Sequence, residues 1–461
     1  MPILGAFIVP HPPLIVAEVG RGQQLKCQKT IEAYRQIAKS IATLSPDTIL
    51  IITPHSTTYS NYFHISPGHV AEGSFQEFGA RDVKIKTEYD EGLVNEIISI
   101  AQSNGLQVGT RGEKQKALDH GTMVPLYFIQ KEYQAFKTVR LSLSGFSPLA
   151  HYHLGQSIQK AINKTNRRVV IVASGDLSHK LKEDGPYGLS KEGPLFDEQI
   201  IQAMKNADFM KFLNFDSQFC EKAAECGLNS FIIMAGALDG LSVEPTLSSY
   251  EGPFGVGYAI ASYHITGEDL SRCFDKQFYI EEKERIDKLK VKEDPYVQLA
   301  RRTIESYVLN HTRVARPKDL PKAMLTERAG VFVSLKLDGR LRGCIGTISP
   351  TMATIADEII QNAISAGTRD PRFDPVEASE LPRLVYSVDV LGTSAPIQSM
   401  DELDVLKYGV IVRLDSRSGL LLPNLEGVDT PEEQVEIALQ KAGIHFNEPY
   451  TMERFEVVRH Y

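Results

Sequence analysis

Three short apolar runs, each followed by a loop that contains histidine, constrain the fold of this 461-residue chain more than any other feature. They are residues 3–9, which lead to Pro10-His11, residues 48–52, which lead to Thr53-Pro54-His55, and residues 168–173, which lead to Ser-Gly-Asp-Leu-Ser-His at 174–179. Continuous β-branched runs are typical of strands that are buried on both faces. Helix-period segments at 24–44, 91–103 and 153–164 alternate with these runs. The N-terminal part is therefore predicted to be an α/β domain.

The histidines that follow the runs are the first candidates for a functional site. Reactive groups in such sheets gather just beyond the carboxyl ends of the strands, so we expect His11, His55 and His179 to meet. Two histidines and one carboxylate would leave open coordination positions on a non-heme iron ion. The pKa of an unperturbed histidine lies near neutrality, which suits His179 for proton transfer. Asp176 either orients His179 or caps the following helix, and each histidine taken alone also fits an ordinary hydrogen-bonded loop.

A second globular pattern occupies the C-terminal part of the chain. Residues 266–294 are highly charged and are predicted to form a linker or a solvated helix between domains at 1–265 and 295–461. Strands are expected at 331–337, 383–391, 409–414 and 455–459, and helices at 296–309, 351–366 and 431–443. The segment 341–347 is predicted to be a loop in which Arg342 lowers the pKa of the Cys344 thiol, or in which the backbone cradles an anion. The alternative is a tight turn with a buried cysteine.

Charge and cysteine content exclude several classes of protein. The net charge is −8, with 50 Lys and Arg against 58 Asp and Glu, and no long basic run is present, so nucleic acid is not an expected partner. No run of eighteen apolar residues predicts a membrane span, and residues 1–13 lack the features of a secretory signal. The five cysteines are widely spaced and form no Cys-x-x-Cys pair. A reducing cytoplasm is the expected compartment, and the oligomeric state stays open, a homo-oligomer included.

Four motifs occur in an order that resembles a known family. They are Pro10-His11, Pro54-His55, Asp119-His120-Gly121 with Val124-Pro125-Leu126, and the segment 174–179. Over about residues 1–265 the chain is similar to the catalytic (LigB-like) subunit of the class III extradiol dioxygenases and to the Memo protein. The resemblance implies a mixed sheet flanked by helices, with ferrous iron held by two histidines and a glutamate. It assigns His11 and His55 as iron ligands, His179 as the acid/base group and His120 as a histidine that faces substrate.

The carboxylate ligand has three candidates. In the dioxygenases it lies near the start of a late helix, and the matching stretch here is 223–231, in which Glu225 is the predicted ligand. Memo proteins carry a cysteine at about this point, so Cys226 is an alternative, and Glu244 is a third. A thiolate ligand would favour zinc or copper over ferrous iron. The implied reaction is the opening of a small aromatic diol by dioxygen, in which His179 takes a proton from the diol and His120 hydrogen-bonds dioxygen or a substrate oxygen.

The C-terminal part resembles a second family. The segment 341–347, with Asp-Pro-Arg-Phe-Asp-Pro at 370–375 and Gly-Leu-Leu-Leu-Pro at 419–423, is similar to the AMMECR1 domain over about residues 295–461. That resemblance implies an α+β fold but no reaction. The fusion resembles protein A of the AmmeMemoRadiSam systems, which implies a radical S-adenosylmethionine enzyme as a partner. Two functions therefore compete: an iron-dependent extradiol dioxygenase, or a metal-binding component of a modification system whose AMMECR1 domain acts through Cys344 or as a binding module.

Overall fold

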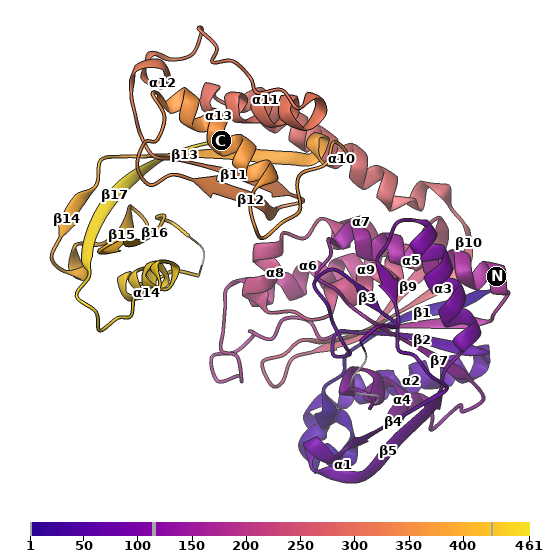
Figure 1. The fold of residues 1–461 in the computed structure, drawn as a ribbon. Helices are drawn as coiled ribbons and strands as arrows, with labels where there is room; N and C mark the ends of the chain where they lie inside the picture. The colour runs from indigo at the N-terminus through magenta and orange to yellow at the C-terminus, as the bar shows by residue number, and fades with distance from the viewer. Residues whose placement is uncertain (1, 113–116, 426) are drawn as a thin grey trace. The chain divides into compact units, whose positions relative to one another are not determined.

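The computed structural model describes residues 2–112, 117–425 and 427–461, and the chain divides into two units, Met1–Tyr279 and Ile280–Tyr461 (Figure 1). Each unit has hydrophobic clusters of its own. The charged segment that was expected between two domains contains a 19-residue helix, α10 (Phe274–Lys292).

A mixed sheet forms the centre of the first unit. Within the described residues it has six strands in the order β7-β2-β8-β1-β10-β9. The strands are β1 (Ile3–Val9), β2 (Thr48–Thr53), β7 (Lys137–Ser142), β8 (Val169–Ser174), β9 (Leu241–Glu251) and β10 (Tyr258–Glu268). Strands β7, β2, β8 and β1 are parallel, whereas β10 and β9 are antiparallel to their neighbours. The α/β fold with a mixed sheet is therefore confirmed.

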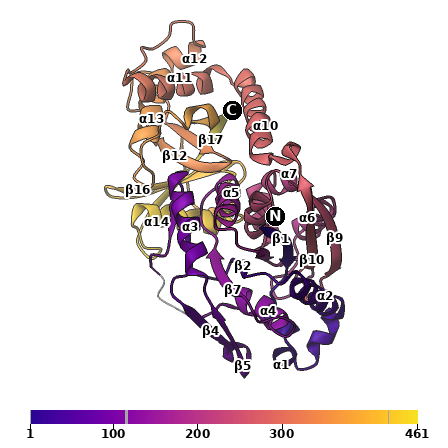
Figure 2. The same cartoon turned by 90° about the vertical axis from the view of Figure 1, so that its right-hand side faces the viewer.

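Helices cover both faces of this sheet (Figures 1 and 2). In β1, Ala6 and Ile8 belong to the hydrophobic core on one face, and Phe7 and Val9 belong to the core on the other. Because successive side chains of a strand point to opposite faces, both sets must be apolar, which explains the continuous apolar runs. The helices are α1 (Ala17–Gly20), α2 (Gln28–Leu44), α3 (Glu91–Ser103), α4 (His120–Ile129), α5 (Pro148–Thr165), α6 (Glu192–Asn206), α7 (Phe209–Leu213), α8 (Ser217–Ala223) and α9 (Leu228–Ala237). Two small sheets pair β3 (Phe63–His64) with β6 (Val108–Gly109), and β4 (Val70–Phe75) with β5 (Ala80–Glu88).

The second unit has an α+β fold. Its described residues form a seven-stranded sheet with the order β12-β11-β13-β17-β15-β16, in which β14 also pairs with β17. The strands are β11 (Val331–Leu337), β12 (Arg340–Gly346), β13 (Leu384–Leu391), β14 (Ala395–Ile397), β15 (Tyr408–Leu414), β16 (Arg417–Leu421) and β17 (Thr451–His460). The helices are α11 (Pro295–Asn310), α12 (Lys322–Thr326), α13 (Ile355–Thr368) and α14 (Pro431–Ala442). The segment predicted to be a loop around Cys344 is instead strand β12, which pairs with β11.

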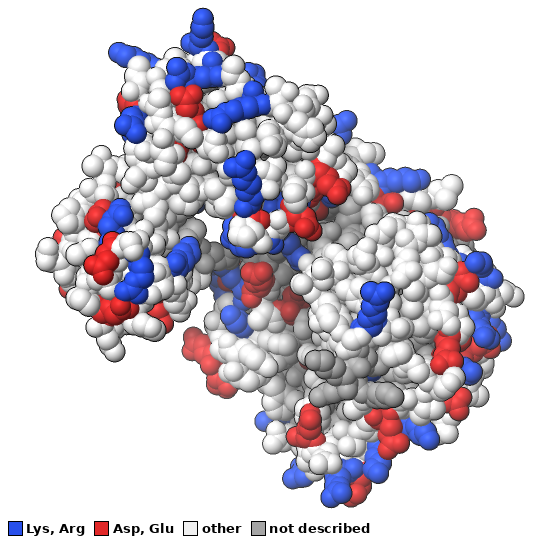
Figure 3. All heavy atoms as spheres, viewed as in Figure 1, with Lys and Arg blue, Asp and Glu red and all other residues white. Residues whose placement is uncertain are grey.

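Basic and acidic side chains are interspersed on the face shown in Figure 3. Such a mixture does not form the single-sign stripe that tracks a phosphate backbone. None of the helices in the described ranges is long and apolar enough to cross a membrane.

Candidate metal centre

Adjacent parallel strands bring the histidine loops to one edge of the sheet. Strand β8 pairs with both β1 and β2, and Val9 at the end of β1 lies opposite Ser174 at the end of β8. The loops that carry His11 and His55 therefore start on the two sides of the end of β8. The carboxyl edge of an open parallel sheet is where ligand sites form, as the sequence predicted.

Three side chains meet beyond these strand ends. The Nε2 atoms of His11 and His55 lie 2.9 Å apart, and Sγ of Cys226 lies 3.6 Å from Nε2 of His11. The ligand atoms of all three residues lie within 4.8 Å of one another. Bonds of about 2.0 Å to nitrogen and about 2.3 Å to sulfur, at angles of about 90–110°, place two nitrogens about 2.8–3.3 Å apart and nitrogen and sulfur about 3.0–3.5 Å apart. The separations of 2.9 and 3.6 Å are close to those that one ion requires.

The third member of this group is Cys226, and Glu225 does not belong to it among the described residues. Oε2 of Glu225 accepts a hydrogen bond of 2.7 Å from the backbone N–H of Leu228, at the start of α9. The first N–H groups of a helix lack intrahelical partners, so a carboxylate is stabilised there. Glu244 is exposed on β9, an edge strand of the sheet. The structure therefore places the alternative ligand Cys226, rather than the predicted Glu225, with the two histidines.

Hydrogen bonds orient His11 and Cys226. The Ser174 hydroxyl donates to the carbonyl of Gly121 over 2.7 Å, so its oxygen is left to accept from Nδ1 of His11 over 3.0 Å. A proton on Nδ1 leaves Nε2 of His11 unprotonated, as a metal ligand must be. The backbone N–H of Asp176 donates to Sγ of Cys226 over 3.3 Å, which stabilises a thiolate. The Asp176 carboxylate accepts the backbone N–H of His11 over 2.8 Å, so His11 and Cys226 are both hydrogen-bonded to the loop that contains Asp176.

Two further histidines border the group. The ring centroid of His120 lies 4.1 Å from that of His55 and 5.4 Å from that of His11. The ring of His179 lies 5.1 Å from that of Tyr187, and its Nε2 atom is buried without a hydrogen-bond partner among the described residues. A buried polar atom normally has a partner, so this nitrogen is available to a bound molecule.

Burial lowers the pKa of all four histidines. The pKa of His11 lies well below its usual value because the ring is buried and the rings of His55, His120 and His179 surround it. Burial, and next the proximity of His55, lowers the pKa of His120 and of His179 to about 4. The pKa of the Cys226 thiol is raised by burial and by nearby carboxylates. At neutral pH the imidazoles therefore carry no charge, and the thiol keeps its proton until a cation displaces it.

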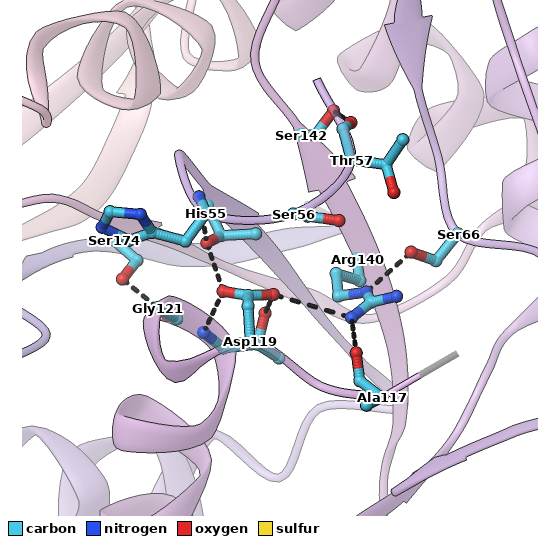
Figure 4. A network of polar contacts seen from close by, with 12 residues as sticks. His55, Ser56, Thr57, Ser66, Ala117, Asp119, Gly121, Arg140, Ser142 and Ser174 are labelled. Carbon is cyan, nitrogen blue, oxygen red and sulfur yellow. Dashed lines mark hydrogen bonds and ion pairs between the residues drawn. The ribbon is translucent and has the colours of Figure 1, made fainter. Parts of the chain in front are cut away.

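A buried network that the sequence analysis missed supports His55. Arg140 lies in β7 and is 2% exposed, and its Nη1 lies 3.6 Å from Oδ2 of Asp119 (Figure 4). The other oxygen of Asp119 accepts the Thr53 hydroxyl over 2.7 Å, and Oγ1 of Thr53 accepts the backbone N–H of His55. The sequence signal was an arginine in the middle of a buried strand, because a buried charge needs a partner.

A pocket of about 540 Å³ opens beside this network. Its lining includes His55 and His120 from the candidate centre, together with Phe78, Asp119 and Arg140. The ring of Phe78 lies edge-on to His120, with the centroids 5.5 Å apart. This volume is typical of sites for small molecules, and the pocket reaches one of the three potential ligands.

The candidate site of the second unit differs from the prediction. Arg342 forms two hydrogen bonds to the carboxylate of Glu380, at 2.6 and 2.9 Å, and is absent from the groups that shift the pKa of Cys344. Burial raises the pKa of the Cys344 thiol, whereas the hydroxyl of Ser334, which donates to Sγ over 3.2 Å, and the charge of Arg372 lower it. The contacts of Arg342 therefore give no support to the prediction that it lowers the pKa of Cys344, because its guanidinium is held in an ion pair with Glu380.

Comparison with known proteins identifies both parts of the chain. Residues 5–261 match the family described as the catalytic LigB subunit of aromatic ring-opening dioxygenase. The chain belongs to the LigB family. Residues 297–460 match the AMMECR1 family, so the predicted fusion of the two domains is confirmed.

Relatives of the chain occur in several microorganisms. Protein CA_C1420 of Clostridium acetobutylicum is 40% identical over 468 residues, covering 100% of this chain and 99% of the relative. A protein of Thermotoga maritima is 49% identical over 170 residues, which are 36% of this chain and 98% of the relative. The crystal structure of protein PH0010 from Pyrococcus horikoshii covers 36% of this chain and 88% of its own, with 33% identity and a TM-score of 0.34.

Proposed function

We propose that the first unit is a metal-dependent enzyme that acts on a small molecule, with one divalent ion held by His11, His55 and Cys226. The observation that carries this proposal is the convergence of three ligand atoms within 4.8 Å in a chain of the LigB family. The donor set suits an ion, because the imidazoles are neutral and Ser174 leaves Nε2 of His11 unprotonated. Three protein ligands leave a coordination position for substrate.

The ion, when bound, supplies a Lewis acid that lowers the pKa of a substrate hydroxyl group. His179 is unprotonated at neutral pH, since its pKa is about 4, and its Nε2, which has no hydrogen-bond partner in the part of the chain that the structure describes, accepts the proton of that hydroxyl. His120, beside His55 at the pocket wall, donates a hydrogen bond to a second substrate oxygen. Phe78 packs against His120 and forms an apolar part of the pocket wall.

Extradiol cleavage of a catechol by dioxygen, with ferrous iron, is the reaction that family membership supports. A second function is favoured by one observation, the presence of Cys226 in the ligand group. A thiolate prefers zinc or copper, and zinc does not activate dioxygen. In that case the first unit binds an ion and a small ligand as a component of a modification system, and a radical S-adenosylmethionine partner supplies the redox chemistry.

Metal analysis of the full chain after anaerobic purification, followed by oxygen uptake with a panel of catechols, separates the two functions. The dioxygenase binds one ion per chain, and His179→Gln lowers its oxygen uptake about 10²–10⁴-fold while the metal content stays the same. One bound ion without oxygen uptake from any diol supports the second function. A chain that binds no ion contradicts both.

A further inference from the structure

The second unit contains a cavity of about 220 Å³ that is lined by residues of this unit alone. It lies where the segment before β11, the segment after β12 and the loop between β13 and β14 meet strands β15 and β17 (Figure 1). The proposed metal chemistry of the first unit uses none of these residues. The cavity therefore needs an explanation of its own.

The buried part of the cavity lining is apolar, and the part that reaches solvent is polar. Leu391, Ile411 and Phe455 are buried and belong to one hydrophobic cluster of the second unit. Two arginines and three residues with hydroxyl groups make up most of the polar part, and no carboxylate is found among the described residues that line the cavity. These polar residues are Arg328, Arg413, Ser349, Thr393 and Ser394. This composition favours a ligand with a negative charge and an apolar portion.

Arg328 is held in place by neutral groups. Its Nε donates to the carbonyl of Met352 over 3.1 Å, and its Nη2 donates to the carbonyl of Pro350 over 3.3 Å. No carboxylate in the described ranges forms an ion pair with this guanidinium, and its Nη1 group donates to none of the described residues. Two hydrogen bonds restrict a side chain that would otherwise sample many rotamers, so binding an anion costs less conformational entropy.

Arg413 is held in place by a carboxylate that it shares with another residue of the lining. Its Nε donates to Oε1 of Glu453 over 3.0 Å, and the hydroxyl of Ser394 donates to Oε2 of the same carboxylate over 2.6 Å. Neither Nη group of Arg413 makes a hydrogen bond within the part of the chain that the structure describes. The two arginines of the lining and this one carboxylate leave a net positive charge beside the cavity.

We propose that this cavity binds the phosphate group of a small molecule, with Arg328 and Arg413 as the residues that recognise it. The unused donors are the Nη1 group of Arg328, both Nη groups of Arg413 and the hydroxyls of Ser349 and Thr393, which bond to no described residue. A carboxylate offers two oxygens to these donors, whereas a phosphate monoester offers three and carries a charge of about −1.5 to −2 at neutral pH. The cavity is smaller than the roughly 300–1,000 Å³ of sites for drug-sized ligands, so the rest of the ligand is short and contacts the apolar part of the lining. This inference is independent of the metal centre and gives the second unit a binding role.

Inorganic phosphate and acetate are the probes, because both are small anions and they differ in charge and in the number of oxygens. Titration calorimetry measures their affinities for the full chain at one pH and one ionic strength. The wild type is expected to bind phosphate at least about tenfold more tightly than acetate. Arg328→Gln and Arg413→Gln are each expected to weaken phosphate binding about tenfold or more, since each removes a charge-assisted hydrogen bond. Arg302→Gln removes the same charge from an exposed position on α11 and should bind phosphate like the wild type.

The outcomes separate a site in this cavity from binding elsewhere on the chain. A wild type that shows no saturable binding of phosphate, or that binds acetate as tightly, overturns the proposal, and this comparison requires no variant to fold. Phosphate bound to an ion in the first unit persists in both arginine variants, and that result overturns the proposal as well. Thermal unfolding without phosphate checks that the variants are folded, because Arg413→Gln also breaks the ion pair with Glu453.

Discussion

Replacing Cys226 with alanine is expected to release the ion from the first unit, whereas replacing Glu225 with glutamine is expected to leave it bound. The two residues are neighbours in one loop, and both are partly buried, so the pair of variants tests which of the two side chains binds the ion. Sγ of Cys226 belongs to the group of three ligand atoms within 4.8 Å. Oε2 of Glu225 is instead hydrogen-bonded to the N–H of Leu228 at 2.7 Å.

The two substitutions are expected to change the affinity for the ion by amounts that differ at least about tenfold. Four-ligand structural zinc sites bind with about 10–16 kcal/mol, so one ligand accounts for about 2.5–4 kcal/mol. At about 1.4 kcal/mol per factor of ten, Cys226→Ala weakens binding about 60- to 700-fold. The amide oxygen in Glu225→Gln can still accept from Leu228, so α9 loses only the interaction of a charge with the helix N-terminus, about 0.3–1 kcal/mol. That loss lowers stability slightly and does not act on the ion.

Competition with a chromophoric chelator measures both affinities in one buffer, and thermal unfolding of the same samples reports stability. Wild-type affinity in Glu225→Gln, with a loss of at least about 60-fold in Cys226→Ala, supports the sulfur ligand. The reverse result, in which Glu225→Gln loses the ion and Cys226→Ala retains it, would show that the carboxylate is the ligand and that the loop rearranges around the ion.

Two further predictions concern pH and packing. Burial raises the pKa of Asp197 to about 7, so the folded chain keeps a proton that the unfolded chain loses above about pH 4, and stability falls as the pH rises between these values. Urea unfolding at pH 5 and pH 7.5 should show that Asp197→Asn removes about 1–4 kcal/mol of this pH dependence, and an unchanged dependence refutes the assignment. A Cβ atom at Gly343 would lie 2.2 Å from the carbonyl oxygen of Ala366, so Gly343→Ala should cost about 2 kcal/mol or more in thermal unfolding. Gly267→Ala, with no atom within 4 Å of its Cβ, should change stability by less than about 0.5 kcal/mol, and equal losses in the two variants would contradict the packing argument.

The strands and the histidine pair could be predicted because they depend on local pattern. An apolar run such as 48–52 must be buried on both faces, and burial on both faces requires helices on both sides of the sheet. Neighbouring parallel strands end at the same edge of the sheet. Because β1 and β2 flank β8, the loops that follow them bring His11 and His55 together at this edge. Four strands of the second unit, β11, β13, β15 and β17, were predicted in the same way, and α10 lies in the segment whose charge indicated a linker or a solvated helix.

The choice between Glu225 and Cys226 could not be made from sequence, because no period governs side-chain direction in a loop. Ala224 has a left-handed backbone with φ of 53°, which redirects the chain just before the two residues. Gly175 allows the loop to approach closely, since a Cβ there would lie 2.2 Å from Cα of Gly227. That contact brings Cys226 to the Asp176 loop, and it joins residues about fifty positions apart.

The segment around Cys344 was misjudged for a related reason. Two glycines suggested a loop, but each is required by packing in a strand. Gly343 allows β12 to approach the backbone of α13 at Ala366, and a Cβ at Gly346 would lie 2.2 Å from the ring of Phe332. Glycine in a strand often marks a close approach of this kind, and a single sequence does not distinguish it from a turn.

The identity of the third ligand determines which ion the site prefers, as well as the geometry of the site. Two neutral imidazoles with either a carboxylate or a thiolate give a divalent site the same net charge, so substrate polarisation changes little between them. A thiolate is a softer donor than a carboxylate, and a softer donor shifts the preferred ion away from ferrous iron. Only a redox-active ion can bring dioxygen and a diol into reaction, whereas Lewis-acid chemistry needs no electron transfer. Membership of the LigB family therefore leaves the reaction open between these two, and the identity of the bound ion is the property that separates them.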